Sequence, residues 1–182
     1  MAIKTFTSGA VLTAADTNTY LANSGLVYIK SQTIGTGVAS VTVTDAFSTT
    51  YDNYRITITK AGASASVSMC LNYGTSAVSY FGIETYTLYS AATITVANNS
   101  NDTKQFLGLT DAGAASYNSS LDVFSPFLAS TTQLTGQYYG RGYIGYFGGS
   151  HEVSASYTSF KLFNESGTLT GGTITVYGYR KA

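Results

Sequence analysis

Apolar and polar residues alternate in short runs from about Leu26 to the end of the chain. A period of two places apolar side chains on one face of a strand and polar side chains on the other. The stretch 76–90 lacks clean alternation, so we expect a long exposed loop there. The pattern predicts about ten short strands, at residues 41–43, 54–59, 66–73, 92–97, 105–109, 121–124, 133–139, 152–157, 159–163 and 172–179.

Turn signals separate most of these runs. Residues 98–102, 111–113 and 164–167 are rich in Asn, Asp, Ser and Gly, which favour turns. Pro126 is expected at a strand end or a bulge. Thr and Ser at alternate positions suit strands that face water on one side. Short strands at this spacing predict an all-β fold, an antiparallel β-sandwich of jelly-roll type, over residues 26–182.

The first 25 residues follow a different pattern, which predicts a short helix. Thr13 can cap this helix, and Asp16 lies at its third position, where a negative charge suits the first turn. Leu12, Tyr20 and Leu21 can form one apolar stripe. A helix of about two turns is marginal alone, so it needs a partner surface. We therefore divide the chain into an N-terminal docking arm, 1–25, and a sandwich domain, 26–182.

The composition contains little material for catalysis. The 182 residues include 1 Cys, 1 His, no Trp and 18 charged side chains (9 basic, 9 acidic), but 16 Tyr and 19 Gly. Zero net charge disfavours partners such as nucleic acid and anionic membranes, and no apolar run is long enough to insert in a membrane. A near-neutral surface gives little protection against self-association. The sequence predicts a non-enzymatic protein that assembles through buried contacts.

The titratable residues reveal no catalytic, cofactor or metal site. His151 and Glu152 are adjacent, so on a strand they would point to opposite faces, and we expect His151 at the surface or a loop edge. No two acidic residues lie close enough in the sequence to indicate a catalytic carboxylate pair, although residues on separate strands can form one. Cys70 sits in an apolar run and is expected to be a small buried residue. We expect no cofactor.

An aromatic cluster between residues 138 and 149 is the main candidate surface. Tyr offers rigid contact area at low entropy cost, and Gly permits close approach. Three roles stay open for the cluster: a contact between subunits, part of the core, or a contact with a host receptor. Tyr80, Phe81, Tyr86 and Tyr89 form a second, weaker candidate. The candidate contact residues of the main cluster are Tyr138, Tyr139, Arg141, Tyr143, Tyr146 and Phe147.

Residues 6–21 read FTSGAVLTAADTNTYL. This segment resembles the N-terminal segment of many tailed-bacteriophage virion proteins, with the pattern F-T-x-G-x-V-L-T-A-A-D-x-N-x-Y-L. Residues 47–56, 123–127 and 166–180 are similar to strand regions of β-rich phage fibre and appendage domains. The resemblance implies a structural protein of a phage particle, often trimeric, located in the virion and assembled in the host cytoplasm. It implies no catalytic residues.

The resulting expectation is a trimeric tail appendage or fibre-type protein that displays its sandwich for host-surface attachment. Its partners would be its own copies, other virion proteins and a host glycan or receptor. The alternatives are a capsid decoration protein and a glycan-degrading tail-spike enzyme. The residues expected to dock the arm to the particle or to sister chains are Phe6, Val11, Leu12, Tyr20 and Leu21.

Overall fold

The computed structural model describes residues 7–16, 25–113 and 116–181. Apart from the short helix α1 (Ala14–Asp16), the regular structure in these residues consists of strands. The strands are β1 (Leu26–Thr33), β2 (Ser40–Val43), β3 (Asn53–Ala63), β4 (Ser68–Tyr73), β5 (Tyr80–Leu88), β6 (Ile94–Asp102), β7 (Gln105–Leu109), β8 (Tyr117–Phe124), β9 (Ser130–Tyr139), β10 (Tyr143–Ala155), β11 (Phe160–Asn164), β12 (Leu169–Thr170) and β13 (Thr173–Tyr179).

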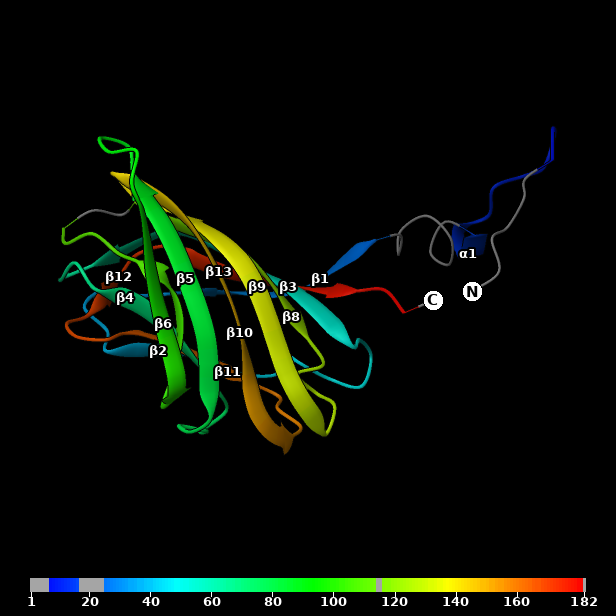
Figure 1. Cartoon of the computed structure of the whole chain (residues 1–182). Coiled ribbons are helices and arrows are strands. Elements are labelled where there is room, and N and C mark those ends of the chain that lie inside the picture. The colour runs from blue at the N-terminus through cyan, green and yellow to red at the C-terminus, as the bar shows by residue number, and fades with distance from the viewer. Residues whose placement is uncertain (1–6, 17–24, 114–115, 182) are drawn as a thin grey trace.

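These strands form two antiparallel sheets, as Figure 1 shows. The large sheet has the order β1-β13-β3-β8-β9-β10-β5-β6, with β12 beside β3, and the small sheet has the order β2-β11-β4-β7. The quartets β1-β13-β3-β8 and β2-β11-β4-β7 reproduce the strand order of a jelly roll, in which two Greek keys pack face to face. The predicted jelly-roll sandwich is therefore confirmed.

Two hairpins of the described chain are additions to this jelly roll. The β5–β6 hairpin is inserted between β4 and β7, and the β9–β10 hairpin between β8 and β11. The β9–β10 hairpin joins the large sheet beside β8, and the β5–β6 hairpin continues the sheet beside β10. Figure 1 shows both as long curved strands. The small sheet contains only the jelly-roll strands, so the large sheet is much wider. The edges of the large sheet are β1 on one side and β6 on the other.

The core between the sheets contains six buried tyrosines beside its aliphatic residues, and the hydroxyl groups of three of them bind the backbone. Tyr54, Tyr80 and Tyr117 are fully buried. The Tyr117 hydroxyl donates to the Leu107 carbonyl at 2.6 Å, and the Tyr80 hydroxyl accepts from the backbone N–H of Tyr73 at 2.8 Å. These hydrogen bonds offset the cost of burying a hydroxyl without a partner, which is about 1–3 kcal/mol. Much of the unusual tyrosine content thus serves packing.

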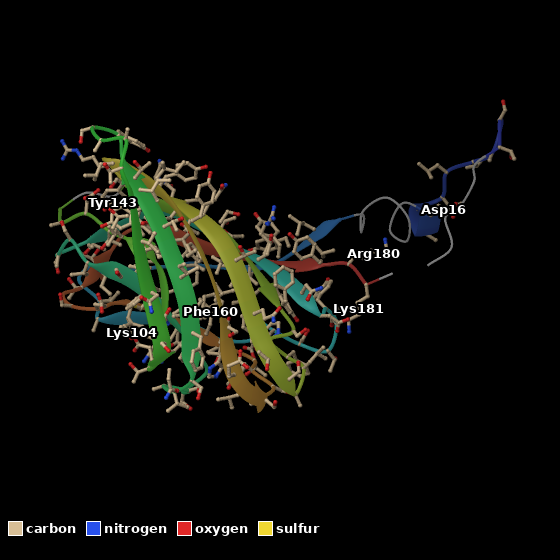
Figure 2. The ribbon with its side chains drawn as sticks, viewed as in Figure 1. Asp16, Lys104, Tyr143, Phe160, Arg180 and Lys181 are labelled. Carbon is tan, nitrogen blue, oxygen red and sulfur yellow. The ribbon has the colours of Figure 1, made fainter. Side chains whose placement is uncertain are left out.

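The arm residues of the structure lie apart from the sandwich, as Figure 1 shows for α1 and Figure 2 for Asp16. The predicted cap of α1 is confirmed: Thr13 Oγ1 accepts from the backbone N–H of Asp16 at 3.1 Å. The Asp16 carboxylate accepts from the backbone N–H of Thr13 at 3.2 Å, which closes a reciprocal capping box. Among the described residues, no helix is long and apolar enough to cross a membrane.

Three local expectations are wrong. The segment expected as a loop at 76–90 contains the nine-residue strand β5. The turn expected at 98–102 instead belongs to β6, where a register shift and a positive φ of 53° at Asn101 mark a bulge. Strand β10 also begins at Tyr143, well before the expected start near Glu152. The expected burial of Cys70 is confirmed, and burial raises the pKa of its thiol.

Candidate functional site

The candidate site lies on the outer face of the large sheet, the face directed away from the small sheet. Strand pairing brings side chains of β3, β8, β9, β10 and β5 into register in rows across this face. The central row is Arg55, Asp122, Thr135, Gly148 and Ile83, each directly opposite the next on neighbouring strands. The jelly-roll strands therefore contribute two residues of the row and the inserted hairpins the other three.

Two further rows flank the central one. One contains Asn53, Phe124, Gln133, Ser150 and Phe81, and the other contains Thr57, Ser120, Gln137, Tyr146 and Thr85. The strands alternate, so all of these residues share the outer face.

A shallow groove follows these rows, and we call it the face groove. Its larger hollow, about 490 Å³, lies over Gly148 between Ile83 and Phe124. A second hollow, about 320 Å³, lies over Asp122 and Gln137 and shares Thr135 with the first. Gly148 carries no side chain between Thr135 and Ile83 in the central row, which leaves the floor of the larger hollow open.

The charged groups in the face groove neutralise each other. The Arg55 Nε and Nη2 groups donate to the two carboxylate oxygens of Asp122 at 2.8 and 2.7 Å, and the Tyr179 hydroxyl donates to Asp122 Oδ1 at 2.6 Å. Partial burial opposes ionisation of Asp122, but these hydrogen bonds prevail and hold the pKa of its carboxyl below the ordinary value. Asp122 is therefore a fixed carboxylate held by donors.

Beside the groove, the free edge of the large sheet is apolar. Ile94 and Val96 of β6 are 69% and 60% exposed, and Ile83 opposite Asn98 is 52% exposed. A small hollow of about 110 Å³ between Ile94, Ile144 and Tyr146 connects this edge to the face groove. We call the exposed part of β6, Ile94–Asn98, the edge patch. Strands usually protect such edges with charge, proline or a bulge, and here the bulge and Asp102 lie beyond Asn98.

The structure divides the aromatic cluster between the core and the surface. Three of the six residues are buried, namely Tyr138, Tyr143 and Phe147. Their burial supports a role in the core and keeps a partner from contacting them. Tyr139, Tyr146 and Arg141 are exposed. Tyr146 lines the face groove, whereas Arg141 lies in the β9–β10 turn, where its backbone N–H donates to Asp111 at 3.0 Å.

Several residues of the face groove were not singled out by the sequence. Ile83, Phe124, Thr135 and Gly148 lie on four strands, and only strand register brings them together. Phe81, part of the weaker aromatic candidate, does line the groove, but Tyr80 beside it is buried. The Gly148–Gly149 pair was the available signal, because adjacent glycines within a strand mark a place of close approach.

The expectation of a surface His151 is wrong. His151 is fully buried, because β10 continues through it and its side chain shares the inward face with Phe147. The imidazole Nε2 is hydrogen-bonded to the Tyr157 hydroxyl at 2.8 Å. Burial lowers the pKa of His151, so it is neutral at pH 7 and serves the core.

Glu84 on β5 is a buried carboxyl group of the sandwich, and its side chain accepts a hydrogen bond from the Tyr138 hydroxyl. Burial raises the pKa of Glu84, although the hydrogen bond from Tyr138 acts against the rise. Glu84 is 3% exposed and faces the core side of the sheet, away from the face groove. Within the described part of the chain, no three His, Cys, Asp or Glu side chains converge as a metal site would require.

Two of the expected docking residues can be placed on the arm. Val11 is 81% exposed and Leu12 is 50% exposed, so neither is covered by the sandwich. Phe6, Tyr20 and Leu21 lie outside the described residues. No family model, curated protein or solved structure matches this chain.

Proposed function

We propose that this chain is a non-enzymatic structural component of a phage virion: a trimeric tail appendage that is docked through residues 1–25 and displays the jelly roll for host-surface attachment. The observation that carries the display role is the outer face of the large sheet. The face groove is open and is lined by uncharged polar and apolar side chains around one neutralised ion pair. Jelly rolls serve both as viral coat domains and as lectins, but the proposal rests on this site and not on the fold.

The same face argues against the tail-spike enzyme. Glycoside hydrolysis ordinarily uses two carboxyl groups that flank the scissile bond. Asp122 is the only carboxylate among the residues that line the two hollows of the face groove. It is bound by Arg55 and Tyr179, which leaves no second acid opposite it. This arrangement supports binding rather than hydrolysis.

The edge patch supports assembly with further copies of the chain. Its residues between Ile94 and Asn98 carry no charge, and the whole chain has a net charge of zero. Copies therefore approach without electrostatic repulsion, and burial of exposed Ile94 and Val96 contributes about 1.5–3 kcal/mol per side chain. The arm and the edge patch occupy opposite sides of the sandwich, because the arm precedes β1 and the patch lies on β6. Docking and assembly can thus proceed on separate surfaces.

Deletion of residues 1–25 tests the proposal in phage particles. The truncated chain should fold, as shown by a cooperative thermal transition, but should be missing from purified particles that contain the intact chain. A matched variant, Val11→Ala with Leu12→Ala, should reduce incorporation without changing the sandwich. Absence of the intact chain from particles would overturn the proposal. The number of copies per particle distinguishes the proposed tail appendage from the alternative, a capsid decoration protein, since an appendage is present in few copies and a decoration protein in hundreds.

A further inference from the structure

We propose that the face groove binds a neutral glycan, a chain of uncharged sugar rings. This assignment rests on the proposed function, because it names the chemical class that the displayed sandwich contacts. The site exists only because the two inserted hairpins extend the jelly roll, since Gly148, Thr135 and Ile83 all belong to inserted strands.

The floor of the groove suits the flat face of a sugar ring. A pyranose presents C–H groups on its faces and hydroxyls around its rim, so it needs an apolar floor and a polar border. Gly148 provides an open floor, and Ile83 and Phe124 flank it at 52% and 37% exposure. Tyr146, 57% exposed, supplies a rigid ring beside the second hollow.

The border of the groove supplies both hydrogen-bond donors and acceptors. Gln133 and Thr135 are exposed, and Gln137 is partly exposed. Amide side chains and hydroxyls can each donate and accept, as sugar hydroxyls do. Arg55 and Asp122 are held in place by their mutual hydrogen bonds, so they present fixed groups with little entropy left to lose.

The charge balance selects an uncharged ligand. Arg55 is the only cation and Asp122 the only anion that line the two hollows, and they form an ion pair at 2.7 Å. An anionic polymer gains affinity by neutralising its charges with free Lys or Arg. The groove offers no free cation for that purpose, so an acidic polysaccharide or a nucleic acid has no electrostatic advantage.

Backbone pairing argues against a peptide ligand. An extended peptide usually joins a sheet at an exposed edge, where it pairs with free N–H and C=O groups. Strands β8, β9, β10 and β5 each have a neighbour on both sides. The groove therefore offers side chains and no free strand edge, which suits a glycan better than a peptide.

Gly148→Tyr tests the assignment without removing any existing side chain. A Cβ at Gly148 would lie 3.5 Å from the Leu134 carbonyl oxygen, an ordinary contact, so a larger side chain can extend into the groove. Tyr also favours strands, so the variant should be as stable as the original chain. Gly142→Tyr is the matched control, because Gly142 lies in the β9–β10 turn outside the groove and a Cβ there meets nothing within 4 Å.

The full chain is titrated calorimetrically with neutral hexasaccharides of glucose, mannose, galactose and N-acetylglucosamine, and with an acidic galacturonate hexasaccharide. At least one neutral probe should bind, Gly148→Tyr should weaken that binding about tenfold or more, and Gly142→Tyr should leave it unchanged. The acidic probe should bind more weakly than the best neutral one.

Three results would overturn the assignment: no binding of any neutral probe, equal binding by Gly148→Tyr and the original chain, or preference for the acidic probe. A change in oligomeric mass caused by Gly148→Tyr would also overturn it, because the face would then be a subunit interface. These measurements use purified protein. A negative result would therefore reject the glycan assignment alone, because the virion proposal is decided separately by incorporation into particles.

Discussion

The imidazole ring of His151 lies 4.2 Å from the phenol ring of Tyr80, and the two ring planes are within 12° of parallel. Tyr73 and Tyr157 also lie against His151, with ring centroids 5.8 and 5.5 Å away. The single histidine is thus enclosed by aromatic rings on β4, β5 and the segment after β10. It is a packed core residue, and burial favours its neutral form.

This enclosure makes stability sensitive to mild acid. Burial lowers the pKa of His151, so below the unfolded value of about 6.5 the unfolded chain binds a proton that the folded chain does not. The His151 contribution to stability is therefore lost as the pH falls below about 6.5. His151→Phe keeps an aromatic ring and removes the titration, so the fall in melting temperature between pH 7 and pH 5 should become smaller. An unchanged pH profile would show that other groups control it.

The hydrogen bond between Tyr138 and Glu84 gives a second prediction. Tyr138→Phe removes the only donor described for this buried carboxyl group, so the free energy of unfolding should fall by about 1–3 kcal/mol. Tyr139→Phe is the matched control, because Tyr139 is the next residue on β9 and is 38% exposed. Urea denaturation at pH 7 measures both. Equal stability of the two variants would contradict a structural role for the Tyr138 hydroxyl.

Adjacent glycines on β10 should respond oppositely to alanine. A Cβ at Gly149 would overlap the Phe81 carbonyl oxygen and the Gln105 side chain, whereas a Cβ at Gly148 has room. Gly149→Ala should therefore destabilise the fold by about 1–3 kcal/mol or more, since overpacking forces backbone shifts. Gly148→Ala should be neutral or slightly stabilising. Thermal unfolding of the two variants compares the two faces of one strand. Similar falls in melting temperature in both variants would contradict the open position of Gly148 on the outer face.

The edge patch leads to a prediction about oligomeric state. Val96→Lys introduces a charge in the middle of the exposed part of β6, a change that blocks strand pairing between molecules. Size-exclusion chromatography with light scattering should show the original chain as an oligomer and the variant at lower mass. Thr33→Lys on the opposite edge strand β1 is the control and should keep the original mass. A monomeric original chain would remove the basis for the edge patch as a contact.

Local alternation predicted those strands whose two faces differ in polarity. On β3, Ile56 and Ile58 are buried between partly or fully exposed Thr57 and Thr59, so the period of two is plain. On β5 the polarity is reversed in places, since Glu84 faces inward and Ile83 outward. The reversed polarity made the sequence of β5 resemble a loop. The segment still forms a strand, because tertiary contacts such as the hydrogen bond from Tyr138 compensate for the buried Glu84 carboxyl group.

The face groove could not be predicted from the sequence, because its residues meet only through pairing between distant strands. Arg55 lies opposite Asp122, which is 67 positions away in the chain, and Gly148 lies opposite Ile83, which is 65 positions away. The sequence grouped Tyr138 and Tyr139 as candidate contact residues, but alternation alone could not show which of the two packs against the small sheet. That choice depends on the whole sandwich.

The pairing of β1 with β13 has a practical consequence for engineering the chain. Leu26 is paired with Tyr179, so anything fused after the last strand emerges next to the arm, and Figure 2 shows Arg180 and Lys181 on the side that faces it. A bulky reporter fused after Lys181 would therefore crowd the arm, which we propose as the docking segment. The exposed turn at residues 89–93 joins β5 to β6 at the opposite edge. An epitope inserted there would project away from the arm and leave the arm unobstructed.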